Sequence, residues 1–152
     1  MIWLSEAAIN QRVVEMTARF DDIGETVARD EGAATGYRWL QWGVVAPHVG
    51  LELGRFQYDE YYQQQDGGWT MVKYAYDFLE VSRESRLAFH AHPVHRPEPT
   101  PHVHCEPEQG KPAHHHYRFD ELTIHEALEE HMRWWASDTD LSCDELRPLL
   151  PY

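Results

Sequence analysis

The three residues Asp66-Gly67-Gly68 separate two long runs of aromatic and β-branched residues, and this arrangement constrains the fold more than any other feature of the chain. The runs are residues 50–63 and 69–81. Because side chains of this kind pack well on a pleated surface, both runs are predicted to be strands. Aspartate followed by glycine readily adopts the positive φ angles of a tight turn, so the two strands should form a hairpin. The sheet that contains them is therefore predicted to be antiparallel.

Further strands extend this sheet on either side of the hairpin. Residues 37–46 have a similar composition, and residues 86–92 follow a polar turn. His102 and His104 lie in a proline-rich segment, where only a short strand or an edge strand is expected. Taken together, residues 37–119 are predicted to form a curved antiparallel sheet of about five or six strands.

Helical signals occur at both ends of the chain. Ser5 is a good N-cap, and apolar residues recur after it at spacings of three and four, namely Ile9, Val13, Met16 and Phe20. A helical N-terminal segment is therefore predicted over residues 1–34. Near the other end, Thr123 and Glu126 have the spacing of a capping box, which predicts a helix over residues 123–136. Both helices are expected to pack on the sheet.

Composition and charge fit a single α+β domain of residues 1–152, long enough to bury a core of its own. The chain carries 13 basic and 26 acidic side chains, and its formal net charge of -13 argues against broad binding to duplex DNA. Cys105 and Cys143 are too few for a disulfide framework, which favours a reducing cytoplasm. The first residues contain neither a basic region nor a long apolar run, so neither a signal peptide nor a membrane span is expected.

Histidines are concentrated in one part of the chain. Eight of the eleven lie between Arg83 and Arg118, at His90, His92, His95, His102, His104, His114, His115 and His116. This segment has a formal charge of +1, whereas the remainder of the chain carries -14. On a strand, residues two apart point to the same face, so each His-x-His pair would present two imidazoles to one metal ion or one phosphate. The functional site is therefore predicted in and beside the His-rich segment of residues 90–116.

A longer pattern in this part of the chain resembles a known family. Pro101-His102-Val103-His104 precedes an acidic, proline-containing segment, and Tyr117-Arg118-Phe119 then runs into the C-terminal helix. This order is similar to that of the TumE family, toxin components of bacterial toxin-antitoxin operons. In that family an aromatic-rich meander leads into a His-x-His segment, a Tyr-x-Phe strand and a closing amphipathic helix. The resemblance covers roughly the last two thirds of the chain.

The chain departs from the family at two places. Its N-terminal helical segment is longer, and His90-Ala91-His92 replaces the usual Asp-Asn. The resemblance therefore points to His102, His104 and Tyr117 as site residues. It implies a growth-arresting toxin. A toxin of this size commonly attacks RNA, so an endoribonuclease with an RNA substrate and no membrane partner is expected. A cognate antitoxin protein is also implied, and a basic, DNA-binding antitoxin would suit the acidic remainder of this chain.

RNA cleavage without a metal needs a base, an acid and a cation beside the phosphate. In this interpretation His102 and His104 are the acid-base pair and no cofactor is required. Arg86 and Arg118 would hold the phosphate, and Tyr117 would donate a proton or stack on a base. Whether the toxin forms a homodimer stays open.

Metal binding is the competing interpretation. His102, His104 and Glu108 reproduce part of the ligand spacing of cupin-like metal sites, although Arg96 stands where a glycine normally precedes that motif. Zinc or another divalent ion would then be held by His102, His104 and one further histidine, drawn from His90, His92 and His114. A third interpretation is a non-catalytic partner protein that only binds an antitoxin.

Overall fold

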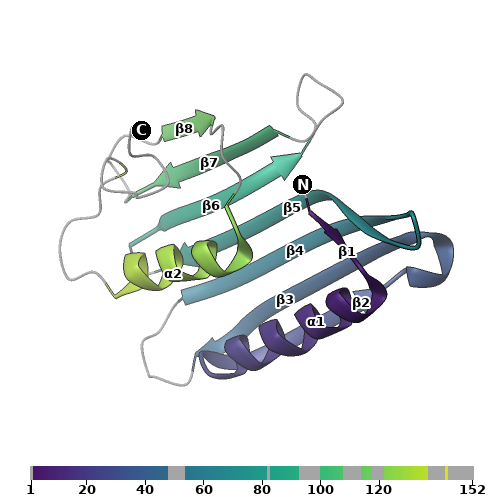
Figure 1. The fold of residues 1–152 in the computed structure, drawn as a ribbon. Helices are drawn as coiled ribbons and strands as arrows, with labels where there is room; N and C mark the ends of the chain where they lie inside the picture. Colours follow the sequence, from purple (N-terminus) through teal and green to yellow (C-terminus); the bar gives the residue numbers. More distant parts are fainter. Residues whose placement is uncertain are drawn as a thin grey trace.

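The computed structural model describes residues 2–47, 54–81, 83–92, 100–107, 114–117, 122–136 and 143. Within these residues, eight strands form one antiparallel sheet, and two helices lie on one of its faces (Figure 1). From β2 to β8 the strands follow one another across the sheet in chain order. The predicted α+β class, with a helix near each end of the chain, is confirmed. The sheet contains more strands than expected.

The elements have the following bounds. The helices are α1 (Glu6–Asp21) and α2 (Ile124–Trp135), and a short 3-10 turn, η1 (Ala33–Thr35), precedes β3. The strands are β1 (Trp3–Leu4), β2 (Gly24–Glu31), β3 (Tyr37–Pro47), β4 (Gly54–Gln65), β5 (Gly68–Glu80), β6 (Ser85–His92), β7 (Thr100–Glu106) and β8 (His114–Tyr117). β1 pairs with the first residues of β5, and β6 pairs with the remainder of that strand.

The N-terminal helix is shorter than predicted. α1 ends at Asp21 and is followed by strand β2, so the prediction of helical structure through residues 24–31 is wrong. β2 is the edge strand beside β3, and most of its side chains are exposed. Its sequence therefore lacks the alternation that marks a half-buried strand, and pairing with β3 decides its conformation. Charged side chains suit such an edge because they discourage pairing with another chain.

The local turn and capping signals are confirmed. Asp66 and Gly67 have φ angles of 51° and 73°, the positive values that a tight turn between β4 and β5 requires. The Ser5 side chain accepts a hydrogen bond from the backbone N–H of Ala8. Thr123 and its partner at the third helical position form both hydrogen bonds of a capping box.

The apolar core lies between the two helices and the sheet face that they cover. The central strands β4 and β5 contribute large side chains that are at most 4% exposed, namely Phe56, Tyr58, Tyr62, Met71, Tyr74, Tyr76 and Phe78. The helices contribute Ile9, Met16 and Phe20 from α1, and Ile124, Ala127, Leu128 and Trp134 from α2. We call the opposite sheet face, which points away from α1 and α2, the far face.

An ion pair is buried within this core. Glu60 of β4 is 0% exposed, and Arg12 of α1 donates two hydrogen bonds to its carboxylate, of 2.6 and 2.8 Å. The hydroxyls of Tyr62 and Tyr76 donate to the same carboxylate over 2.7 and 2.6 Å. Burial alone would lower the pKa of Arg12, but the hydrogen bonds and charge of Glu60 raise that pKa above its ordinary value. The Glu60 carboxylate therefore accepts four hydrogen bonds, two from Arg12 and one from each tyrosine.

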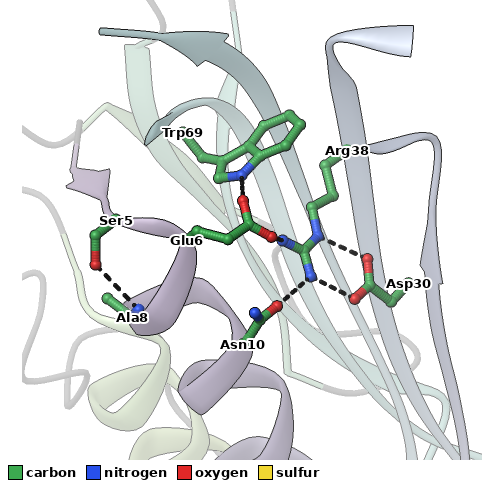
Figure 2. A network of polar contacts seen from close by, with 7 residues as sticks. All are labelled: Ser5, Glu6, Ala8, Asn10, Asp30, Arg38 and Trp69. Atoms are coloured by element: carbon green, nitrogen blue, oxygen red, sulfur yellow. Dashed lines mark hydrogen bonds and ion pairs between the residues drawn. The ribbon is translucent and has the colours of Figure 1, made fainter. Parts of the chain in front are cut away.

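A second polar network fixes the start of α1 (Figure 2). The Arg38 side chain of β3 is 5% exposed and donates to Asp30 of β2 over 2.6 and 2.7 Å. It also donates to Asn10 and Glu6 of α1 over 2.8 and 3.2 Å. Trp69 of β5 donates its indole N–H to Glu6 over 2.6 Å. Arg38 thus connects the edge strand β2 to helix α1, and Glu6 extends this network to β5 near the centre of the sheet.

His131 of α2 is a core residue rather than a site residue. It is 0% exposed, and its ring packs against Phe89 and Phe78 at centroid distances of 5.2 and 5.6 Å. The Tyr58 hydroxyl is hydrogen-bonded to its Nδ1. Burial lowers the pKa of His131 to about 3, so the imidazole is neutral in the folded protein. In the unfolded chain the same group titrates near its ordinary value of about 6.5.

This difference predicts a loss of stability in mild acid. Between the two pKa values the unfolded chain binds one more proton than the folded protein, so stability falls as the pH falls below about 6.5. The slope approaches about 1.4 kcal/mol per pH unit, or roughly 2–3 kcal/mol at pH 4.5. His131→Asn keeps an acceptor for Tyr58. In this variant the loss of unfolding free energy between pH 7 and 4.5 should be smaller than in the wild type by that amount. Urea unfolding between pH 7 and 4.5 measures it.

The matched control is His125→Asn, because His125 lies on the same helix but is exposed. Partial burial and the neighbouring Arg19 also lower the pKa of His125, so this variant should flatten the dependence of stability on pH slightly, and much less than His131→Asn does. Both variants keep the other histidines, so their contributions cancel in the comparison. Equal slopes for His131→Asn and wild type would contradict the neutral core imidazole.

The two cysteines are paired in the structure. Cys105 of β7 and Cys143 form a disulfide that spans 38 residues of sequence, and both are buried. Nothing in their spacing predicts this bond. Disulfides persist mainly in oxidising compartments. The cytoplasmic location therefore stays a prediction, and the cysteines no longer support it.

Candidate metal centre

Two strands present their histidines to the far face of the sheet. In β6 the core residues Leu87, Phe89 and Ala91 alternate with His90 and His92, so the two imidazoles point away from the helices. In β7 the core residues are Val103 and Cys105, and His102 and His104 alternate with them. The prediction that each His-x-His pair lies on a strand and shares one face is confirmed.

The strand register brings the two pairs together. β6 and β7 are antiparallel, with His90 directly opposite His102 and Ala88 opposite His104. The ring centroids of His92 and His102 are 4.7 Å apart, and those of His90 and His102 are 5.6 Å apart. His104 lies 5.0 Å from His90 and 5.1 Å from His102 by the same measure. Four imidazoles thus form one cluster, which we call the histidine cluster.

Three members of the cluster are spaced for a metal ion. One ligand atom from each of His90, His92 and His102 lies within 4.8 Å of the other two. A tetrahedral zinc ion at the usual Zn–N distance of about 2.0–2.1 Å holds its nitrogen ligands roughly 3.4 Å apart. The three nitrogens must therefore approach one another further to hold such an ion. His102 is 3% exposed, and the other two are partly exposed.

Asp77 of β5 orients one of these ligands. Its Oδ2 is hydrogen-bonded to Nε2 of His90 over 2.9 Å. Its Oδ1 accepts two hydrogen bonds from Arg86, from Nε over 3.0 Å and from Nη2 over 2.6 Å. Burial alone would raise the pKa of Asp77, but the hydrogen bond and charge of His90, together with the charge of Arg86, hold that pKa below its ordinary value. The carboxylate is therefore ionised and fixed between His90 and Arg86.

The structure brings most of the predicted site residues to one region. Arg86 lies at the edge of the histidine cluster and contacts it through Asp77 rather than directly. Tyr117 and His115 of β8 are paired in backbone register with His102 and His104. Of the remaining predicted residues, His114 and His116 belong to strand β8. His95, Glu108 and Arg118 lie outside the described residues.

Sequence reasoning missed Asp77 as a site residue. The available signal was the alternation of Asp77 with the apolar residues Tyr76 and Phe78 along a predicted strand, which places Asp77 on the opposite face of the sheet. The register across three strands, with Asp77 beside Ala88 and Ala88 beside His104, shows that this face is the one that carries the histidines.

No protein-family model, curated protein or solved structure matches this chain. The resemblance to the TumE family therefore stays a prediction. Within the described part of the chain, no helix is long and apolar enough to cross a membrane.

Proposed function

We propose that the chain binds a divalent ion of the zinc class through His90, His92 and His102 and uses it to activate water for hydrolysis. The observation that carries this proposal is the convergence of three imidazole ligand atoms from two adjacent strands. Imidazole nitrogen suits zinc and neighbouring transition metals. Three histidine ligands and one remaining position for water are a common catalytic zinc set, in which the metal lowers the pKa of the bound water towards neutrality.

The contact between Asp77 and His90 supports the proposal independently. A histidine that binds a metal usually donates its other ring N–H to a carboxylate, which fixes the tautomer and the ring orientation. When Nε2 of His90 donates to Asp77, the lone pair resides on Nδ1. Arg86 in turn fixes the carboxylate. Such a chain of contacts is unnecessary for a histidine that is merely exposed on a sheet.

His104 completes the proposed chemistry. Its ring lies beside His90 and His102, at centroid distances of 5.0 and 5.1 Å, but outside the set of three ligands. Imidazole exchanges protons readily near neutral pH. We assign His104 as the group that accepts a proton from the nucleophilic water or returns one to the leaving group.

Metal analysis of the purified protein tests this proposal. We expect one zinc ion per chain after incubation with zinc and dialysis, and none after His92→Ala, because that variant removes a ligand. Asp77→Asn should retain the site but weaken zinc binding about 10–100-fold, since the orientation of His90 is lost. His125→Ala, an exposed histidine on α2, is the control and should bind zinc like the wild type. Equal zinc binding by His92→Ala and wild type would rule out this ligand set.

A second candidate is the metal-independent ribonuclease of a TumE-like toxin. It is supported by the 5.1 Å separation of the His102 and His104 rings on one strand face and by the presence of Arg86 at the edge of the cluster. Tyr117 lies opposite His102 in the register of β7 and β8. In this candidate the partners are RNA and a cognate antitoxin, and the location is cytoplasmic.

The two candidates differ in their response to a chelator. RNA cleavage that persists in EDTA and is lost in both His102→Ala and His104→Ala would favour the toxin ribonuclease. Hydrolysis that EDTA abolishes and zinc restores would favour the metal site. Expression of the chain alone, with and without the His104→Ala substitution, tests whether either activity arrests growth.

A further inference from the structure

A depression on the far face adjoins the histidine cluster. It has a volume of about 350 Å³ and is lined by residues of β4, β5 and β6, namely Arg55, Gln57, Asp77, Phe78, Leu79 and Arg86. In the strand register Arg55 is opposite Leu79, and Leu79 is opposite Arg86, so two guanidinium groups flank one apolar side chain. Asp77 belongs both to the wall of the depression and to the contact with His90.

The depression extends towards the edge of the sheet. A second depression of about 470 Å³ shares Arg55 and Gln57 with the first and continues over β3 to Gly43 and Val27. A ligand anchored between Arg55 and Arg86 therefore has room for the rest of its structure on the side away from the histidines.

The charges in the depression differ from those of the whole chain, which has a formal net charge of -13. Arg86 is already paired, with Asp77 at 2.6 Å and with Glu106 at 3.9 Å. Arg55 is exposed, and no described side chain accepts a hydrogen bond from it or forms an ion pair with it. A divalent ion at the histidine cluster would add two further positive charges at the same end of the depression.

We propose that this depression binds a phosphate ester group of the substrate, with Arg55 as its principal ligand. Arg86 and the amide of Gln57, which also donates to Asp59 over 3.1 Å, are additional donors. The inference rests on the proposed function, because it names the substrate class of the same metal site. Arginine presents two parallel N–H groups that match two phosphate oxygens. A phosphate group has enough oxygens to accept hydrogen bonds from donors on both sides of Leu79.

Arg55 is the residue that tests this assignment without disturbing the metal ligands. Arg86 is unsuitable because it fixes Asp77, which in turn orients His90. Arg55→Gln removes one charge and the guanidinium fork from an exposed position. Arg29→Gln is the matched control, because Arg29 is an exposed arginine on β2 that does not line either depression.

The probe is inorganic phosphate, titrated calorimetrically into zinc-loaded and metal-free protein at low ionic strength, with acetate as a second anion. We expect phosphate to bind the zinc-loaded wild type and Arg29→Gln equally, and Arg55→Gln at least about tenfold more weakly, because a charge-assisted pair of hydrogen bonds is lost. Zinc stoichiometry should be unchanged in Arg55→Gln. Acetate, with only two oxygens, should bind more weakly than phosphate.

Failure of this inference is distinguishable from failure of the metal site. Phosphate binding that is absent in zinc-loaded wild type, or equal in wild type and Arg55→Gln, overturns the inference while leaving the zinc stoichiometry intact. Acetate that binds as tightly as phosphate overturns the choice of a phosphate ester. If the wild type binds no zinc, the metal proposal fails, and the titrations of metal-free protein decide whether phosphate binding depends on Arg55.

Discussion

Replacement of Arg12 by leucine should destabilise the protein by about 3–5 kcal/mol, the usual cost of removing one partner from a buried ion pair. The substitution leaves the Glu60 carboxylate, which is 0% exposed, without its counter-charge. Tyr62 and Tyr76 still donate to it, but two neutral hydroxyls do not replace a guanidinium. Glu60 must then either remain charged in the core or take up a proton, and both outcomes cost free energy. Urea denaturation at pH 7 measures the loss.

A double variant distinguishes the cost of an unpaired charge from the cost of altered packing. Glu60→Gln combined with Arg12→Leu leaves no charge in the core, and the glutamine oxygen can still accept hydrogen bonds from the tyrosines. We expect the double variant to be more stable than Arg12→Leu alone, even though it carries one more substitution. The control is Arg19→Leu on the same helix, which should cost under about 1 kcal/mol because Arg19 is partly exposed. If the double variant were no more stable than Arg12→Leu, the unpaired Glu60 carboxylate would not be the cause of the destabilisation.

The same arginine shows where sequence patterns stop being informative. The buried stripe of α1 contains Ile9, Met16 and Phe20, and Arg12 lies on that stripe at helical spacing. The helical period predicts the apolar positions but cannot predict that a charged residue between them pairs with a buried carboxylate. That assignment requires Glu60 on the facing strand, 48 residues away. By contrast, the capping box and the turn at Asp66 and Gly67 were predictable because their causes are local.

The candidate metal centre is likewise predictable from the sequence in part only. Alternation along a strand predicts that His90 and His92 share a face, and likewise His102 and His104. Their meeting at one point depends on the register of β6 against β7, in which His90 is opposite His102. A register shifted by two residues would keep every side chain on its face and still separate the ligands. Asp77 depends on a third strand, so sequence reasoning found the histidines but not the carboxylate that orients one of them.

Loss of the disulfide between Cys105 and Cys143 should lower the free energy of unfolding by about 4 kcal/mol. This is the contribution expected when the unfolded chain is no longer closed into a loop of 38 residues. The loop contains β8 and α2, so the bond restricts a large part of the unfolded chain. Cys143→Ser should reproduce this loss in oxidising buffer. Dithiothreitol should destabilise the wild type by the same amount.

The serine variant also provides the control, because dithiothreitol should have no further effect on Cys143→Ser. Thiol titration of the unfolded wild type should find no reactive thiol before reduction and two after it. Cys105 lies between His104 and Glu106 in β7, yet it belongs to the core and not to the far face. Zinc binding should therefore persist in the folded fraction of Cys143→Ser, since the histidine cluster depends on the pairing of β6 and β7. Two reactive thiols in the unreduced protein would instead favour the cytoplasmic location that the sequence predicts.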